Sequence, residues 1–341
     1  MNENFRQRSA PGLTYVAFDS GFKSAQKFLN YWVCNCFLGA GVYGMVPLLN
    51  GDRVLPLPTW YPFDLSVGRR FEAVYGLQYA CQLIVGTIFA NGMGYCMYLY
   101  LLFTVQLDIL CASIKNIPFT ALIKAKKDRK TLKKLQKELE NTHQELNQYS
   151  LGEKSELLED LDKFELNNES FSMTSDTFKD PIVAKYLKEA IADCVLHHQT
   201  IIELLKKVEK ILSGYLFFKL WYHCILMGFI LFVISVIDDG AQIFAFLSYM
   251  FILLTGLFIL TFFGQVLTIQ SSKIINAVMN SPWHLYMFPV KKELSILLAR
   301  GTKPYVLSAG GLMTISIGTY IAIVKAAFSY YTLLIKMNKK P

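Results

Sequence analysis

Long uncharged runs of apolar residues constrain the fold of this chain more than any other feature. One extends from Ala73 to Leu107, another from Gly240 to Ser272, and a third covers residues 304–324. About 20 apolar residues in a helix are enough to cross the hydrocarbon core of a bilayer, which is about 30 Å thick. The runs therefore predict an all-α membrane protein built as a polytopic helical bundle. The 53% hydrophobic content of the 341 residues supports this class.

Two shorter apolar stretches, Phe28–Leu49 and Leu216–Ile237, bring the predicted number of spans to five. The runs at 73–107 and 240–272 exceed one bilayer crossing, so their helices are expected to tilt or to extend below the membrane. A very short turn at 238–240 separates the third span from the fourth.

The polar segments between the spans differ in length and charge. The longest is an insert that begins with nine basic residues between Lys115 and Lys137. Leucines at heptad spacing over Leu132–Leu146 predict an amphipathic helix in it, and a second is predicted from Pro181 into the third span. The predicted segments are a cytoplasmic N-terminal segment at 1–27, two spans in 28–112 with an outer loop at 50–72, the cytoplasmic insert at 113–213, two spans in 214–272, a cytoplasmic loop and helix at 273–303, and the last span at 304–336.

Basic residues near the span ends predict the orientation, because cytoplasmic loops are enriched in Lys and Arg. With the N-terminus inside, the inner side carries the nine basic residues of the insert and five more at 273–303, whereas the outer loop at 50–72 carries three. This asymmetry predicts an inner N-terminus and an outer C-terminus. It also accounts for the net charge of +8 without a nucleic-acid partner.

The last apolar stretch has one side made of small residues. Gly311, Gly318, Ala322, Ala326 and Ser329 keep to steps of three, four or seven residues, so on a helix they share a face. Small and weakly polar side chains on one face of a span favour contact with a neighbouring helix or with water. The stretch is therefore predicted to be a helix that lines something.

Motifs of enzymes and metal sites are absent from the sequence. It has no Gly-rich phosphate loop, no HExxH and no nucleophile elbow, so we predict no enzyme activity and no cofactor. The adjacent pair His197-His198 invites a metal interpretation. Neighbouring helical residues point about 100° apart, and no further His or Cys stands at ligand spacing, so a structural role is favoured.

Several segments, taken in order, resemble the insect odorant receptor family. Each is short, but together with the inverted orientation they are specific. Members of that family have seven spans, and the matches begin at the family's third span, so its first two spans have no counterpart in this sequence. The matching segments are residues 55–62, the Asp108–Cys111 end of the second run, Cys194 with His197-His198, and the closing sequence LSAGGLMTISIGTY…KAAFSYYTLL.

The resemblance implies a subunit of a ligand-gated, non-selective cation channel that detects small volatile odorants. Such a subunit assembles as a tetramer with the shared odorant co-receptor, among the lipids of the plasma membrane of olfactory sensory neurons. The last helix would line the pore, where Leu333 and Lys336 align with the gate and pore-mouth positions. Lys325, a charge well inside the span, is a further candidate. The alternative is that Leu333 faces lipid and Lys336 only extends to the membrane surface.

Candidate ligand-binding residues lie in the predicted outer half of the spans. An apolar pocket with a few polar groups suits a small volatile ligand. Aromatic side chains in apolar spans more often serve packing, and this alternative stays open for each residue. The candidates are Phe37 and Tyr43 in the first span, Tyr79 and Gln82 in the second, and Phe246 and Tyr249 in the fourth.

Two other functions are alternatives to the channel subunit. A seven-helix G-protein-coupled chemoreceptor is opposed by the charge asymmetry and by the number of spans. A secondary transporter would usually show an internal repeat and interrupted paired helices, and the sequence shows neither.

The cytoplasmic placement of the insert can be tested at Asn168, which begins the glycosylation sequon Asn168-Glu169-Ser170. N-glycans are added only on the lumenal side, so Asn168 should remain unmodified when the chain is expressed in cells. Gel mobility before and after glycosidase treatment measures this, and a sequon engineered into residues 50–72 is the positive control. A glycan on Asn168 would overturn the orientation and favour the G-protein-coupled alternative.

Overall fold

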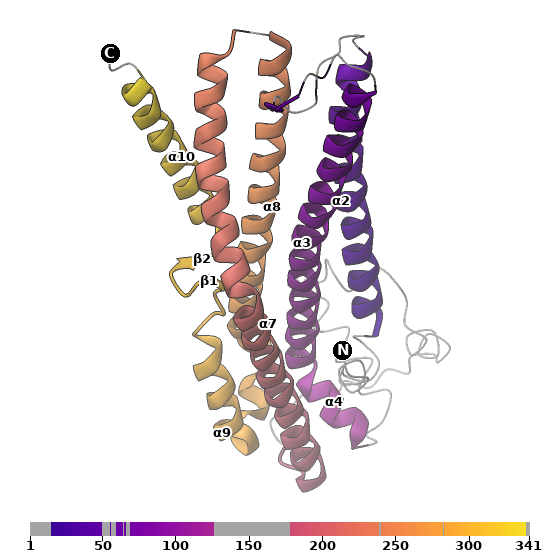
Figure 1. Cartoon of the computed structure of the whole chain (residues 1–341). Coiled ribbons are helices and arrows are strands. Elements are labelled where there is room, and N and C mark those ends of the chain that lie inside the picture. Colours follow the sequence, from indigo (N-terminus) through magenta and orange to yellow (C-terminus); the bar gives the residue numbers. More distant parts are fainter. Residues whose placement is uncertain are drawn as a thin grey trace. The chain divides into compact units, whose positions relative to one another are not determined.

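The computed structural model describes residues 15–49, 55, 59–63, 65, 69–125, 178–238, 240–281 and 283–338. Within these residues the chain forms seven helices and one hairpin of two-residue strands, which confirms the predicted all-α class (Figure 1). The predicted amphipathic helix at Leu132–Leu146 and the sequon at Asn168 lie outside the described residues.

Three helices are much longer than one bilayer crossing. They are α3 (Arg70–Lys115, 46 residues), α7 (Pro181–Val236, 56 residues) and α8 (Gly240–Met279, 40 residues). At 1.5 Å per residue these lengths are about 60 to 84 Å, against about 30 Å of hydrocarbon. The structure therefore confirms that the second and fourth runs form overlong helices. It also confirms that the helix from Pro181 continues unbroken into the third span.

The chain packs as two compact units, and α3, α7 and α8 each contribute a part to both. Unit 1 holds the more polar ends of these helices, whereas unit 2 holds most of the apolar runs. Unit 1 comprises Met1–Lys23, Leu101–Tyr215 and Gly264–Thr314, and unit 2 comprises Ser24–Tyr100, Leu216–Phe263 and Ile315–Pro341.

Four of the described helices are long and apolar enough to cross a membrane. The predicted first span lies in a further helix, α2 (Tyr15–Leu49, 35 residues). The total of five spans and the orientation stay predictions. The four helical segments are Arg70–Lys115, Pro181–Val236, Phe246–Met279 and Ile317–Asn338.

Unit 1 contains two shorter helices, α4 (Ile117–Lys124) and α9 (Trp283–Gly301). Pro289 lies inside α9, and Val290 beside it departs from helical geometry with φ −132° and ψ 20°, because proline lacks the N–H that would continue the helix. One face of α9 packs into the core. Its buried residues recur every three or four positions, the pattern of an amphipathic helix: Tyr286, Val290, Leu294, Leu297 and Gly301.

The core of unit 2 includes a tight contact among α2, α3 and α8 at Gly256. A Cβ added at Gly256 would lie 3.5 Å from Phe89 Cζ, 3.6 Å from Trp32 Cη2 and 3.7 Å from Met93 Cε, which are ordinary van der Waals distances. Trp32 and Met93 are buried. Aromatic and thioether side chains from three helices therefore meet in front of a residue that has no side chain of its own.

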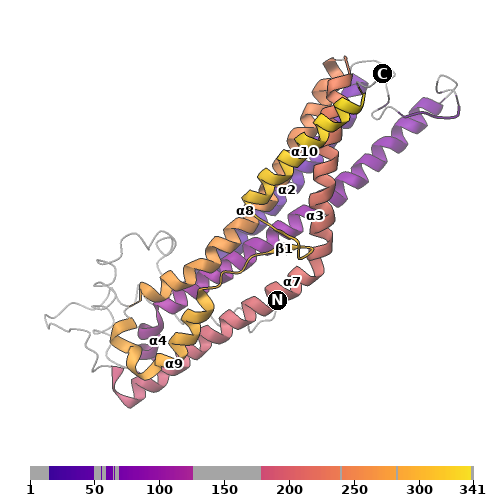
Figure 2. The same ribbon diagram turned by 90° about the vertical axis from the view of Figure 1, so that its left-hand side faces the viewer.

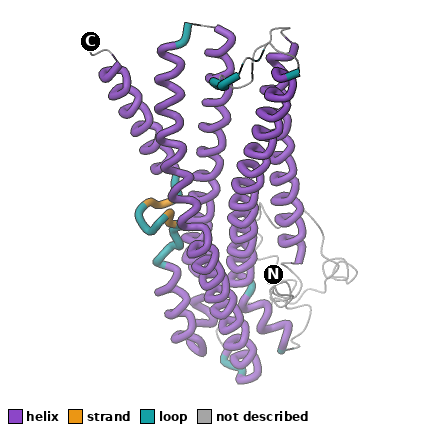
Figure 3. Tube along the Cα trace, in the orientation of Figure 1, coloured by secondary structure: helices purple, strands orange, loops and turns teal. Residues whose placement is uncertain are grey.

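The predicted last span is wrong at its beginning. The prediction placed a helix from residue 304, but the helix α10 covers Ile317–Asn338 only. Before it, strands β1 (Ser308–Ala309) and β2 (Met313–Thr314) form an antiparallel hairpin, drawn in orange in Figure 3. Gly310 and Gly311 make its turn with φ of 63° and 68°, a conformation that glycine adopts without strain. Gly311 therefore belongs to the hairpin and not to the small helical face.

Ser316 then begins the last helix. It precedes Ile317, and the backbone N–H of Thr319 donates to its Oγ at 3.3 Å and to its carbonyl oxygen at 3.0 Å. A serine at this place satisfies a donor that the first helical turn leaves free. The uncharged stretch thus divides into a linker, residues 302–316, and the helix α10.

Candidate functional site

One side of α10 packs against α7 at a glycine, and the two helices run side by side (Figures 1 and 2). A Cβ added at Gly228 would lie 2.9 Å from the carbonyl oxygen of Ala327 and 2.6 Å from Tyr330 Cδ1. The two helix backbones approach too closely there for a larger residue. Thr319 and Ile323 are buried on the same side as Ala327. This contact sets the rotation of α10 about its own axis.

The predicted small-residue side of α10 is exposed. About 100° further round the helix lie larger apolar residues that are also exposed, among them Ile321 at 47% and Phe328 at 56%. One helix thus has a packed side, a bulky apolar side suited to lipid and a small exposed side. We call the last of these the small face, which comprises Gly318, Ala322, Ala326, Ser329, Leu333 and Lys336, all exposed.

The three predicted pore residues all have exposed side chains on α10. Leu333 is 54% exposed and continues the small face, and Lys336 follows it one turn later. Lys325 is one position away from Ala326 and lies at the border between the small face and the bulky apolar side. The roles of these residues as gate and pore mouth stay predictions.

The linker before α10 is held on α7 by what we call the linker anchor, made of Glu209 and Ser213, one helical turn apart in unit 1. The carboxylate of Glu209 accepts hydrogen bonds from the Tyr305 hydroxyl, from the Ser308 hydroxyl and, at 2.9 Å, from the Ser308 backbone N–H. The backbone N–H of Gly310 donates to Ser213 Oγ at 2.8 Å and to its carbonyl oxygen at 3.1 Å. Four hydrogen-bond donors of the linker thus meet two residues of α7.

Electrostatics strengthen the linker anchor. Hydrogen bonds to an ionised carboxylate are about twice as strong as neutral ones. Burial raises the pKa of the Tyr305 hydroxyl, and its hydrogen bond to Glu209 raises that pKa further. The phenol therefore keeps its proton at physiological pH and remains a donor to Glu209. At its other end, the backbone N–H of Tyr305 donates to Ser271 Oγ of α8 at 2.9 Å.

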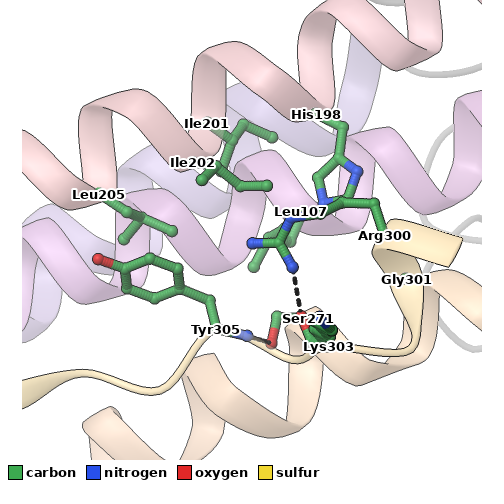
Figure 4. Close-up of a pocket in the computed structure, with 10 residues that line it drawn as sticks. All are labelled: Leu107, His198, Ile201, Ile202, Leu205, Ser271, Arg300, Gly301, Lys303 and Tyr305. Atoms are coloured by element: carbon green, nitrogen blue, oxygen red, sulfur yellow. Dashed lines mark hydrogen bonds between the residues drawn. The ribbon is translucent and has the colours of Figure 1, made fainter. Parts of the chain in front are cut away.

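A crevice in unit 1 lies beside Tyr305 (Figure 4). The guanidinium of Arg300 crosses it and donates to the carbonyl oxygen of Lys303 at 2.7 Å. Its volume is about 10 Å³, room for about one water molecule and not for an odorant. The residues that line it are Leu107, His198, Ile201, Ile202, Leu205, Ser271, Arg300, Gly301, Lys303 and Tyr305.

A second cavity in unit 1 has a volume of about 120 Å³ and lies between the end of α8 and α9, with Trp283 and Lys291 in its wall. Pockets for drug-sized ligands are usually about 300 Å³ or more. None of the six predicted ligand-binding residues lines this cavity or the crevice.

All six predicted ligand-binding residues belong to unit 2. Phe37 and Tyr249 are 43% and 39% exposed, and Tyr79 and Phe246 are half-buried. Gln82 is also half-buried, and its Oε1 is buried without a hydrogen-bond partner among the described residues. The side chain of Tyr43, on α2, lies outside what is described. The structure places these residues on three helices of one unit, and their role in binding stays a prediction.

The histidine pair is buried in unit 1. His197 Nε2 lies 3.2 Å from the Oε1 atom of Gln106 on α3, at hydrogen-bonding distance, and His198 lines the crevice beside Tyr305. In the part of the chain that the structure describes, no group of three or more His, Cys, Asp and Glu side chains could hold a metal ion.

Sequence reasoning missed two residues that the structure brings forward. Glu209 is one of many charged residues in α7, and only the fold shows that it meets Ser308. Lys219 carried a signal that could have been read, because it is the only charged residue between Lys210 and Asp238. The structure buries Lys219 in unit 2, with its Nζ 4.4 Å from the centroid of the Phe89 ring.

The long apolar helices and their packing define a multi-span helical membrane protein. A sequence model described as "7tm Odorant receptor" matches residues 22–328. The chain therefore belongs to the 7tm odorant receptor family, which confirms the resemblance seen in its motifs. Membership implies detection of odorants and indicates a receptor and not an enzyme, and it favours this prediction over a secondary transporter.

Individual relatives agree with this assignment. The chain is 26% identical to Odorant receptor 83a of Drosophila melanogaster and 27% identical to putative odorant receptor 85e of the same species. The alignments cover 100% of this chain and 73% and 71% of the relatives. The fold is similar to that of the insect olfactory receptor OR5 from Machilis hrabei solved with eugenol, with a TM-score of 0.64 and 10% identity. That match covers 97% of this chain and 72% of the other.

The linker anchor predicts a local effect of Glu209→Ala. The substitution leaves the Ser308 N–H and the Tyr305 hydroxyl without their acceptor, which costs about 1–3 kcal/mol for each group that stays buried. Backbone amides of the linker should then exchange hydrogen faster, as measured by hydrogen–deuterium exchange and mass spectrometry. Glu203→Ala, an exposed glutamate on the same helix, is the matched control. Equal exchange in the two variants would show that Glu209 does not hold the linker.

Proposed function

We propose that this chain is the odorant-detecting subunit of a ligand-gated, non-selective cation channel, and that α10 lines the pore. The observation that carries the proposal is the small face. It is exposed, it is distinct from the bulky apolar side that includes Ile321 and Phe328, and Gly228 fixes it in rotation through its contact with Ala327. Small side chains that face neither lipid nor their own subunit suit a water-filled passage or a neighbouring subunit.

One copy of α10 cannot enclose a pore, so the proposal requires partners. Four such helices around an axis would do so, and we propose a tetramer that includes the shared odorant co-receptor. Odorant detection would then occur within this subunit, in the plasma membrane of olfactory sensory neurons. The family membership supports the odorant as ligand, while the exposed small face of α10 supports the pore.

For odorant binding we propose unit 2, where the six candidate residues lie. Its interior is apolar and aromatic, as the contacts of Trp32, Phe89 and Met93 at Gly256 illustrate. Gln82 supports a polar contact to the ligand, because its buried Oε1 has no hydrogen-bond partner within the described residues. Such a mixture is typical of sites for small, mostly apolar molecules.

Leu333 is proposed as the hydrophobic gate. A ring of apolar side chains can close a pore by excluding water. Leu333→Ser should wet this constriction and raise the basal current without odorant, recorded from cells that also express the co-receptor. The effect should be partial, because other subunits contribute the remaining side chains of the ring.

Ile321→Ser is the matched control for the gate. It places the same hydroxyl on the same helix, at a similarly exposed residue of the bulky apolar side. Its basal current should equal that of the wild type at equal surface expression. If Leu333→Ser also leaves the basal current unchanged, Leu333 is not the gate.

Lys336 is proposed to lie at the mouth of the pore, where its positive charge opposes cation entry. Lys336→Gln should therefore raise the single-channel conductance and alter the preference among cations, whereas Lys336→Arg should change neither. The difference should shrink as the salt concentration rises, because an exposed charge is screened beyond about 8 Å at physiological ionic strength. The same conductance in all three proteins would place Lys336 away from the permeation path.

A further inference from the structure

A lysine is buried in the apolar stretch of α7 within unit 2. Lys219 is 7% exposed, and its ammonium group lies over the ring of Phe89, 4.4 Å from the centroid, in a cation–π contact. An ionisable group inside a membrane span is costly and marks a functional site by default. The cation–π contact explains where the ammonium group lies but leaves its charge without compensation by an anion from Phe89.

Two other buried polar atoms around Phe89 have no hydrogen-bond partner among the described residues. They are Nε1 of Trp32 and Nε2 of His223, in side chains that are 6% and 1% exposed. The His223 ring stacks on Phe89 with centroids 6.2 Å apart. Trp32 and Phe89 both approach the space in front of Gly256. Buried polar groups are almost always satisfied, so these two atoms indicate a partner that is not part of unit 2.

The chemistry of that partner follows from the three side chains. His223 Nδ1 lies 2.8 Å from the carbonyl oxygen of Lys219, which can only accept. Nδ1 therefore carries the ring hydrogen, and Nε2 is an acceptor. Trp32 Nε1 and the Lys219 ammonium are donors. The partner must therefore donate one hydrogen bond and accept at least one.

We propose that this cluster binds the carboxyl group of a small apolar carboxylic acid, which rests on the proposed function of unit 2 in binding odorant. The acid hydroxyl donates to His223 Nε2, and the acid oxygens accept from Lys219 and Trp32. Partial negative charge on these oxygens also compensates the buried cation. The apolar tail packs against the aromatic and thioether side chains that meet at Gly256, where the missing side chain leaves space.

Related functional groups satisfy the cluster less well. A methyl ester accepts hydrogen bonds but has no hydrogen to donate to His223. An alcohol donates and accepts, but its single oxygen carries no charge that could compensate Lys219. The proposal therefore predicts a preference for acids over esters and alcohols of the same chain length.

The experiment compares butanoic, hexanoic and octanoic acid with the methyl esters and alcohols of the same chain lengths. Currents are recorded from cells that express the full chain with the co-receptor. At least one acid should activate the channel at about ten-fold lower concentration than its ester and its alcohol, the difference expected for one charge-assisted hydrogen bond. Equal potency across the three functional groups would overturn the proposal.

Lys219→Met tests the charge directly. Methionine is apolar and of similar length, so the fold should be retained, because replacing a buried ion by an apolar side chain is often neutral or stabilising. The acid should lose its advantage, while the response to the ester is unchanged. Phe218→Leu, at the exposed neighbouring position, is the control and should behave as the wild type. An acid preference that survives Lys219→Met would refute the role of Lys219.

Trp32→Phe and Gly256→Ala test the rest of the site. Phenylalanine keeps the aromatic packing but removes the N–H, so the acid should bind more weakly while the thermal stability of the protein stays close to that of the wild type. The alanine methyl group fills the space at ordinary contact distances, so it should weaken acids and esters alike. Unchanged acid potency in both variants would contradict the proposed position of the ligand.

A binding measurement separates this inference from the channel proposal. The melting temperature of the purified full chain in detergent should rise with the preferred acid, and should not rise with its methyl ester or for Lys219→Met. A shift without any current would support the acid site and sink the channel function. Odorant-evoked currents together with no acid-specific shift would support the channel and sink the acid site.

Discussion

Where a chain crosses lipid, each backbone N–H and C=O must find its partner within the protein, and a helix achieves this for every residue except those at its ends. The long helices α3, α7 and α8 follow from this constraint, since an unbroken helix leaves no backbone group unsatisfied in hydrocarbon. The chain departs from helical structure at residues 302–316, and there the freed backbone groups are satisfied by side chains. The N–H groups of Tyr305, Ser308 and Gly310 donate to Ser271, Glu209 and Ser213, in that order.

The same requirement explains how α10 acquires three different sides. Its backbone is satisfied internally, so its orientation depends on packing alone. Gly228 allows the backbone of α7 to approach Ala327 closely, and this contact directs the small face away from the packed side. A larger residue at 228 would push the helices apart and loosen the rotation of α10. The proposed pore therefore depends on a glycine of another helix as much as on the residues that would line it.

Charged residues within the apolar stretches receive opposite treatment. Lys325 on α10 has an exposed side chain, which suits contact with water or with another subunit, whereas Lys219 on α7 is buried against Phe89. A buried cation needs compensation, and the neighbouring atoms Trp32 Nε1 and His223 Nε2 also await partners. A polar ligand can satisfy all three groups together, which links the electrostatics of the span to the chemistry of the molecule it would detect.

Much of this architecture could be predicted because it depends on local composition. Uncharged runs such as Ala73–Leu107 must become helices in lipid, the turn at 238–240 ends one helix and begins the next, and the spacing of Ala322, Ala326 and Ser329 assigns them to one face of any helix that contains them. The start of α10 could not be predicted in this way, because hydropathy does not distinguish an apolar helix from an apolar linker. That difference was decided by Glu209 and Ser213, about a hundred residues away in the chain, which bind the linker only once the fold is formed. The cluster around Phe89 likewise joins α2, α3, α7 and α8, and no periodicity within one segment reports a contact between four. Helix positions were thus determined by the sequence through local hydrophobicity, and the sites by tertiary packing, because a buried polar group finds its partner across the fold.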